Sequence, residues 1–160
     1  MHVTVDLSAQ MLSLWQGETL QKQWPVSTAA NGAGEISGSG CTPRGRHIIR
    51  AKIGLGAEIG AVFKARRIAS DLRCYSPEIG AQYPGRDWIL SRILWLSGCE
   101  VGINRLGCVD TMRRYIYIHG TPHLDALGSP ASHGCIRMGN ADIVELFDLV
   151  PTGIEVTLHE

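Results

Sequence analysis

The chain begins MHVTVDLSAQMLSLWQGETLQKQWPV, and across these residues, 1–26, apolar and polar side chains alternate with a period of two. Val3, Val5 and Leu7 would fall on the same face of an extended strand. Two further apolar runs follow, at 11–15 and at 19–26. The turn Gln16-Gly17-Glu18 separates them. The stretch therefore predicts a β-meander or a pair of hairpins.

The rest of the chain favours a mainly β fold with short helices. Nineteen glycines over 160 residues indicate many tight turns. Further elements are predicted as strands at Gly45–Lys52, Ala61–Lys64, Arg113–His119 and Ile154–Leu158, and as a helix over about 141–149 that Asn140 caps. The run Trp88–Leu96 is apolar on both faces, so a buried strand and a short core helix both remain open. Residues 66–85 are expected to form a long surface excursion.

Composition narrows the class of protein. Hydrophobic residues make up 44% and charged residues 19%, which is typical of a globular protein, and we expect residues 1–160 to form one domain. Fifteen Lys plus Arg balance fifteen Asp plus Glu, so a nucleic-acid partner is not expected. No apolar run reaches the roughly 18 residues of a membrane-spanning helix, so no membrane partner is expected either.

The expected location is the cytoplasm. Residues 1–6 show neither the basic start nor the apolar stretch of a secretory signal. Five cysteines, odd in number and without a CxxC pair, fit a reducing compartment in which thiols stay free.

The segment Ser132-His133-Gly134-Cys135-Ile136-Arg137-Met138 carries the most chemistry. His119-Gly120-Thr121 precedes it, at the end of a predicted strand. A cysteine acts as a nucleophile when a nearby imidazole accepts its proton, and the two residues need only be adjacent in space. Gly134 would let the backbone approach a substrate closely, and the amides of residues 133–135 could face a developing oxyanion.

Two other interpretations of these residues stay open at this stage. A single cysteine beside a single histidine is most often packing. Zinc binding by His119, His123, His133 and Cys135 is the other alternative, although Pro122 breaks the helical spacing and no CxxC or HExxH motif supports it.

On these motifs the sequence resembles the YkuD-type L,D-transpeptidase catalytic domain family. The family's His-Gly-Thr element corresponds to His119-Gly120-Thr121, and its Ser/Thr-His-Gly-Cys element to Ser132-His133-Gly134-Cys135. A Thr-Pro-x-Gly element appears as Thr42-Pro43-Arg44-Gly45. The resemblance extends over nearly the whole chain and implies a YkuD-like fold of two packed, curved sheets with short helices.

The resemblance also implies roles for individual residues. Cys135 would be the nucleophile and His119 its base and later the acid, with a Gly120 carbonyl orienting the imidazole. His133, Gly134 and Cys135 would supply oxyanion amides. No cofactor and no metal is implied. The substrate would be a peptidoglycan stem peptide, cleaved between its third residue and a terminal D-alanine.

Together with the expected location, the resemblance indicates an L,D-carboxypeptidase that trims murein tetrapeptides or muropeptides in peptidoglycan recycling. Only twelve residues separate His119 from Ser132, a short connection for the family that leaves less wall around the acyl site. Two alternatives remain: an exported L,D-transpeptidase that forms cross-links, and a non-catalytic muropeptide-binding domain.

A carboxypeptidase should hold the carboxylate of the leaving D-alanine, a task that suits a guanidinium. Arg137 is the first candidate because it is close to Cys135 in sequence. Arg113 is the second, since alternate residues of one strand would place it on the face of Tyr117 and His119. Ser132 and Tyr117 are predicted to line the same substrate site. The other arginines near these segments are most simply interpreted as exposed to solvent: Arg66, Arg67 and Arg114.

Overall fold

Strands build most of the molecule. The computed structural model describes residues 1–160, and its strands are β1 (His2–Asp6), β2 (Met11–Gln16), β3 (Thr19–Ser27), β4 (Gly45–Ile53), β5 (Val62–Lys64), β6 (Arg67–Ile68), β7 (Ile89–Gly98), β8 (Tyr117–Gly120), β9 (Ile136–Met138) and β10 (Glu155–His159). Two α-helices, α1 (Pro77–Gln82) and α2 (Asn140–Leu149), and two 3₁₀ turns at Gly107–Val109 and Leu124–Ala126 complete it. The predicted mainly β fold is confirmed.

All the strands belong to one hydrogen-bonded sheet, in the order β4-β10-β1-β2-β3-β9-β8-β7-β5-β6. An additional pairing of β4 with β7 closes this sheet into a barrel. The two opposite walls of the barrel correspond to the two packed, curved sheets that were expected. Strand β8 lies between β7 and β9, antiparallel to the former and parallel to the latter. Because β8 and β9 are parallel, the entry to β9 lies beside the start of β8 in the middle of the sheet.

The alternation in residues 1–26 produces the predicted meander. Val3 and Val5 are fully buried on β1, and Leu12 and Leu14 pair with them from β2. Gly17 closes the turn to β3 with a positive φ of 58°, a conformation that costs glycine little. These side chains join the main hydrophobic core, to which helix α2 also contributes.

The predicted cap of α2 is corrected by one residue. Gly139 is the N-cap and offers no side chain, so Asn140 is the first helical residue. The Asn140 amide is used elsewhere: its Nδ2 donates to the Thr121 carbonyl at 3.0 Å, and its Oδ1 accepts from Ser91 Oγ at 2.7 Å. Asn140 thus ties the start of α2 to strands β7 and β8.

The ambiguous apolar run becomes strand β7. It is apolar on both faces because Leu94 and Leu96 pack into the main core while Ile93 and Trp95 pack into a separate cluster on the other face. The register with β8 also shifts between Leu90 and Ile93. Ser91, inside this irregularity, adopts a positive φ of 72°. A β-bulge of this kind places successive side chains on the same side of the strand, which a two-residue period cannot predict.

The predicted strand Arg113–His119 is wrong in its first half, because β8 begins only at Tyr117. Residues 111–115 form turns, in which Asp110 Oδ1 accepts from the Arg113 N–H at 2.9 Å and Tyr115 adopts a φ of +55°. The local hydrogen bonds of the aspartate override the high β-propensity of the segment.

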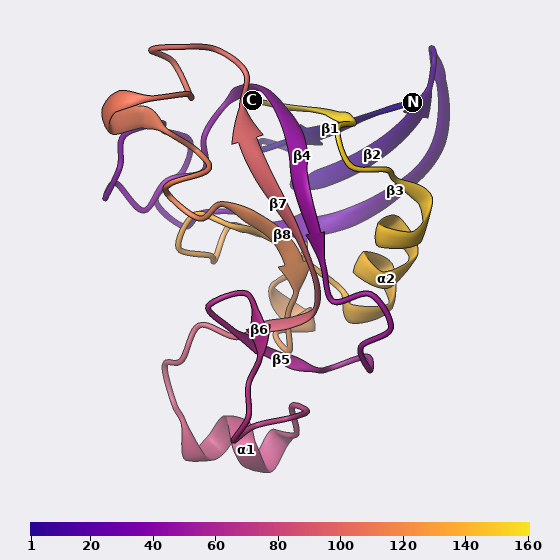
Figure 1. The fold of residues 1–160 in the computed structure, drawn as a ribbon, viewed down its shortest axis with the longest axis vertical. Helices are drawn as coiled ribbons and strands as arrows, with labels where there is room; N and C mark the ends of the chain where they lie inside the picture. The colour runs from indigo at the N-terminus through magenta and orange to yellow at the C-terminus, as the bar shows by residue number, and fades with distance from the viewer.

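The segment that was expected to be a surface excursion carries β6 and α1. Figure 1 shows β5, β6 and α1 gathered at the end of the molecule away from both termini. None of the helices combines the length and apolarity that a membrane span requires.

Candidate active site

Ser132–Cys135 form a tight turn that leads into β9. Ser132 Oγ donates to the Cys135 carbonyl at 2.6 Å and accepts from the Gly134 N–H at 3.2 Å. Ser132 is only 2% exposed. Because its hydroxyl is buried and used within the chain, Ser132 holds the turn in place rather than lining the substrate cavity for which it was predicted.

A second clamp on this turn comes from the Thr-Pro-x-Gly element. Thr42 Oγ1 donates to the Gly134 carbonyl at 2.9 Å and accepts from the Ala29 N–H at 3.0 Å. Gly134 has a φ of +137°, and an added Cβ would lie 3.3 Å from the Cys41 carbonyl oxygen. The turn that presents Cys135 therefore needs glycine at this position for both backbone conformation and space.

The Cys135 thiol lies against the backbone before β8. Its Sγ accepts from the Tyr117 N–H at 3.4 Å and donates to the Tyr115 carbonyl at 3.4 Å. Beside it is a cavity of about 310 Å³, whose lining residues are Ala65, Arg66, Asp87, Ile89, Arg114, Tyr115, Ile116, Tyr117, His133 and Cys135. The thiol is thus held by backbone groups and accessible from a cavity of substrate size.

His119 does not line this cavity and is completely buried. Its Nδ1 donates to the Gly120 carbonyl at 2.7 Å, which leaves the Nε2 lone pair as the acceptor. This Nε2 has no hydrogen-bond partner in the chain. His119 pairs in register with Arg137, two residues beyond Cys135, so imidazole and thiol lie on the same face of adjacent strands.

Burial keeps both groups neutral. It lowers the pKa of His119 below its ordinary value of 6.5, and it raises the pKa of the Cys135 thiol to about 12. The Tyr117 N–H opposes this rise by donating to the sulfur, but the effect of burial is larger. A neutral thiol beside a neutral imidazole with a free lone pair is suited to proton transfer during attack, rather than to a preformed thiolate.

Two backbone amides near the thiol are available to stabilise negative charge. Among the three N–H groups predicted to face an oxyanion, that of Gly134 donates to Ser132 Oγ, whereas those of His133 and Cys135 have no acceptor within the chain. Unpaired donors held on a rigid turn can stabilise a developing oxyanion without reorganisation.

Arg137 lies next to the cavity without lining it. The side chain is buried, and its Nη2 lies 2.8 Å from Asp87 Oδ1. The other oxygen of Asp87 lies 3.6 Å from His133 Nδ1. Arg137 thus has Asp87 as an internal partner, and its predicted contact with a substrate carboxylate stays a prediction.

The other predicted substrate residues are divided between two places. Tyr117 lines the Cys135 cavity. Arg113 lines a different cavity, together with Arg50 and Asp110, because the turn at 111–115 takes it off the β8 face. Arg114 reaches the Cys135 cavity in its place. The residues of the alternative zinc site do not come together, since no group of three or more His, Cys, Asp or Glu side chains is arranged to hold a metal.

Sequence reasoning missed Asp87 and Arg66 as residues of the cavity. A buried arginine almost always has a partner, so the burial of Arg137 beside a nucleophile would have required a carboxylate, but nothing local to Asp87 identifies it. Arg66 lies in a charged, turn-rich segment that is typical of a solvated surface. Its place in the cavity depends on how the β5–β6 hairpin packs, which no sequence period reveals.

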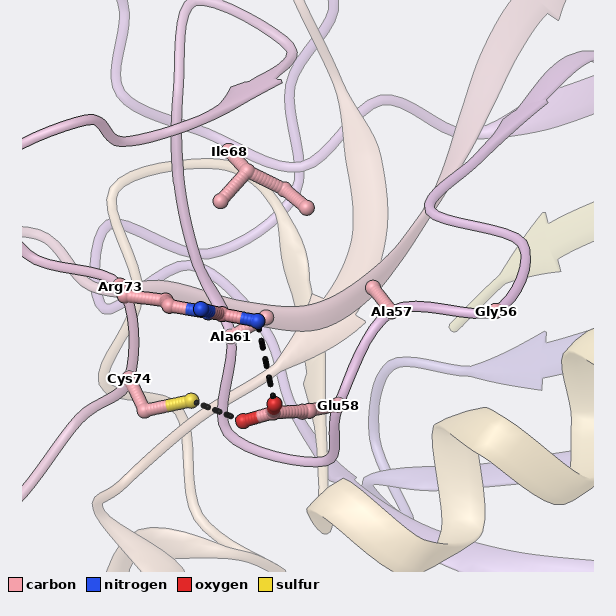
Figure 2. Close-up of a pocket in the computed structure, with 7 residues that line it drawn as sticks. All are labelled: Gly56, Ala57, Glu58, Ala61, Ile68, Arg73 and Cys74. Carbon is pink, nitrogen blue, oxygen red and sulfur yellow. Dashed lines mark hydrogen bonds and ion pairs between the residues drawn. The ribbon is translucent and has the colours of Figure 1, made fainter.

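A second cavity, of about 180 Å³, lies in the part of the molecule that contains β5 and β6. Figure 2 shows Arg73 and Cys74 both reaching the carboxylate of Glu58, at 3.4 and 2.9 Å. No histidine lines this cavity, and no residue of the Ser132–Cys135 turn does so. The Cys74 thiol therefore has a carboxylate beside it but no imidazole.

Similarities to other proteins agree with this geometry. Residues 1–158 match the YkuD family, L,D-transpeptidase catalytic domain. The protein YkuD of Bacillus subtilis (strain 168) is 43% identical over 47 residues, which make up 29% of this chain and 29% of that protein. YqjB of the same organism is 44% identical over 43 residues, 27% of this chain and 24% of that protein.

Solved structures show the same fold. An L,D-transpeptidase from Mycobacterium smegmatis has a TM-score of 0.59 at 18% identity, over 99% of this chain and 58% of its own. An L,D-transpeptidase from Xylanimonas cellulosilytica has a TM-score of 0.56 at 20% identity, over 98% of this chain and 59% of its own. The chain thus spans less than two thirds of these relatives. Because the family match covers nearly all its residues, the chain belongs to the YkuD family of L,D-transpeptidase catalytic domains, a class of cysteine-dependent enzymes.

Proposed function

We propose that the protein is an L,D-carboxypeptidase that removes the terminal D-alanine from murein tetrapeptides through an acyl-enzyme on Cys135. The observation that carries the proposal is a cavity-lining thiol on the chain leading into β9, next to the strand that holds a buried imidazole whose Nε2 has no hydrogen-bond partner. We further propose that it acts in peptidoglycan recycling in the cytoplasm. All five cysteines are free thiols, the state that a reducing compartment maintains.

Acylation would use Cys135, His119 and the two unpaired backbone amides. Cys135 Sγ attacks the carbonyl carbon of the third stem residue while its proton passes to His119 Nε2. The amides of His133 and Cys135 stabilise the oxyanion. The tetrahedral species then collapses, the C–N bond breaks, and His119 returns the proton to the amine of the departing D-alanine. A thioester on Cys135 remains.

Hydrolysis reverses these roles. A water molecule gives its proton to His119 as its oxygen bonds to the thioester carbon, and the C–S bond then breaks to regenerate the thiol. No residue of the connection 121–131 lines the Cys135 cavity. The short connection between the two motifs therefore leaves this side without a wall of its own, which supports access of water to the thioester.

Transpeptidation is the second candidate, and one observation favours it. A neighbouring cavity of about 330 Å³, lined in part by Ser37, Gly38 and Gly40, shares Arg114, Ile116 and His133 with the Cys135 cavity. This space could receive an amine from a second stem peptide. In that reaction the amine, rather than water, attacks the same thioester.

Product masses separate the two reactions. The protein is incubated with murein tetrapeptide alone and with an added acceptor stem, and the products are weighed by mass spectrometry. Tripeptide plus free D-alanine in both mixtures supports the carboxypeptidase. Cross-linked dimer as the main product with acceptor present would favour the transpeptidase. Peptide that remains intact in both mixtures, with no acyl adduct on Cys135, would contradict the whole proposal.

A further inference from the structure

Cleavage of a terminal D-alanine requires a group that recognises its free carboxylate, and the arginines around Cys135 differ in what they have left to offer. Arg137 is buried and paired with Asp87. Arg114 donates to the carbonyls of Gly34, Glu35 and Cys41 at 3.2, 3.1 and 2.6 Å. Both guanidinium groups are therefore used to hold the protein's own structure.

Arg66 is different. It lines the Cys135 cavity and makes one hydrogen bond within the chain, from Nη1 to Tyr117 Oη at 3.0 Å. None of the ion pairs in the structure involves it. A guanidinium has five N–H donors in a planar fork, so most of those of Arg66 remain free for a ligand.

The surroundings of Arg66 hold it in position before any ligand arrives. Its guanidinium carbon lies 4.7 Å from the centre of the Tyr115 ring and 5.3 Å from that of Trp95. Ala65 and Arg66 form the tight turn between β5 and β6, with φ angles of +47° and +65°. Stacking on aromatic rings and a rigid hairpin turn both reduce the entropy that binding would cost.

We propose that Arg66 binds the carboxylate of the leaving D-alanine and thereby selects peptides with a free C-terminus. This inference rests on the proposed function and names a residue for recognition within it. The ligand is a carboxylate, the group whose two oxygens match the guanidinium fork. The negative charge of Asp87 in the same cavity is balanced by Arg137. Arg114 also has no ion pair, but it donates to backbone carbonyls, so Arg66 is the cavity cation whose donors are mostly free.

The test compares two peptides and four proteins. Wild type, Arg66→Gln, Arg66→Lys and Arg67→Gln are assayed on murein tetrapeptide with a free or an amidated D-alanine. Arg67 is the matched control, because it is the next residue on the same hairpin but does not line the cavity. Thermal melting of each variant shows that it is folded.

Wild type should prefer the free carboxylate by roughly ten- to a hundredfold in kcat/KM, the range expected for a charge-assisted hydrogen bond. Arg66→Gln should lose most of that factor on the free peptide and little on the amide, and Arg66→Lys should retain part of it. Arg67→Gln should behave as wild type. An equal loss on both peptides, or no loss on either, would overturn the assignment of Arg66 while leaving the proposed function intact. Absence of cleavage by wild type would overturn both.

Discussion

Cys74 and Cys135 are both free thiols that line cavities, yet their surroundings differ in kind. Cys74 donates to the carboxylate of Glu58 at 2.9 Å, and this hydrogen bond raises the pKa of its thiol. Cys135 has a raised pKa because it is buried, and the Tyr117 N–H that donates to its sulfur works in the opposite direction. The Cys74 thiol donates to a carboxylate whose charge would repel the thiolate. The Cys135 sulfur accepts from the Tyr117 N–H, which would stabilise a thiolate.

The comparison shows that the pKa of the resting thiol does not identify the nucleophile, since it is raised at both sites. What distinguishes Cys135 is the rest of its site. A neutral histidine with a free lone pair lies on the neighbouring strand, and two unpaired amides lie on its own turn. The histidine and the amides take part only while a proton is transferred or an oxyanion forms. The Cys74 cavity contains neither a histidine nor that turn.

The largest effect on activity is expected when the Cys135 thiol itself is removed. Cys135→Ala should abolish release of D-alanine, because no other thiol has a base and oxyanion donors beside it. Cys74→Ala is the matched control and should retain the activity of wild type. Release is measured from purified proteins whose melting temperatures agree. More than a tenth of wild-type activity in Cys135→Ala would show that the nucleophile lies elsewhere.

His119→Ala should lower kcat by about 10²–10⁴-fold, the usual range for removal of a positioned acid–base group. Alkylation of Cys135 by iodoacetamide should slow in the same variant, because the thiol loses the group that accepts its proton. Alkylation of Cys74, followed on the same peptides by mass spectrometry, provides the internal control. If Cys135 reacts at the wild-type rate without His119, then His133 becomes the candidate base.

The pH dependence tests whether the resting pair is neutral. Burial lowers the pKa of His119 from 6.5, so more acid is needed to protonate it, and kcat/KM should hold as the pH falls from 8 to 6.5 and decline only below that. With a thiol pKa of about 12, alkylation of Cys135 in His119→Ala, where no imidazole accepts the proton, should rise roughly tenfold per pH unit between 7 and 10. A plateau near neutrality in this variant would show that the thiol is already ionised at rest.

The parts of this molecule that sequence predicts are those whose signal is local. Alternating residues predict β1–β3, because one face of a strand must be buried, and the motif around Cys135 is recognisable because it combines a nucleophile, a base and a glycine. Arg66 could not be predicted in the same way. Its role depends on a hairpin packing against a strand end some fifty residues further along the chain.

Arg113 shows the opposite error. Its assignment assumed a regular strand from residue 113 to residue 119, but the turn in which Arg113 N–H donates to Asp110 Oδ1 delays the start of β8 to Tyr117. A single local interaction therefore moved the residue into another cavity and brought Arg114 to the site instead.

The smallest expected effect is a change in the reactivity of Cys74, the thiol without a histidine. Glu58→Gln weakens the hydrogen bond that Cys74 donates to the carboxylate and removes its charge, both of which raise the pKa of this thiol, so the pKa should fall and a larger fraction should be thiolate at pH 8. Alkylation of Cys74 should then accelerate by a factor of a few, below the tenfold that a full pKa unit would give. Cys135 alkylation and D-alanine release should not change, because Glu58 does not line that cavity. A Cys74 that becomes more reactive without gaining any acyl adduct from the tetrapeptide would show that thiolate content alone does not make a nucleophile. Formation of such an adduct on Cys74 would contradict the view that the base and oxyanion donors of Cys135 are required.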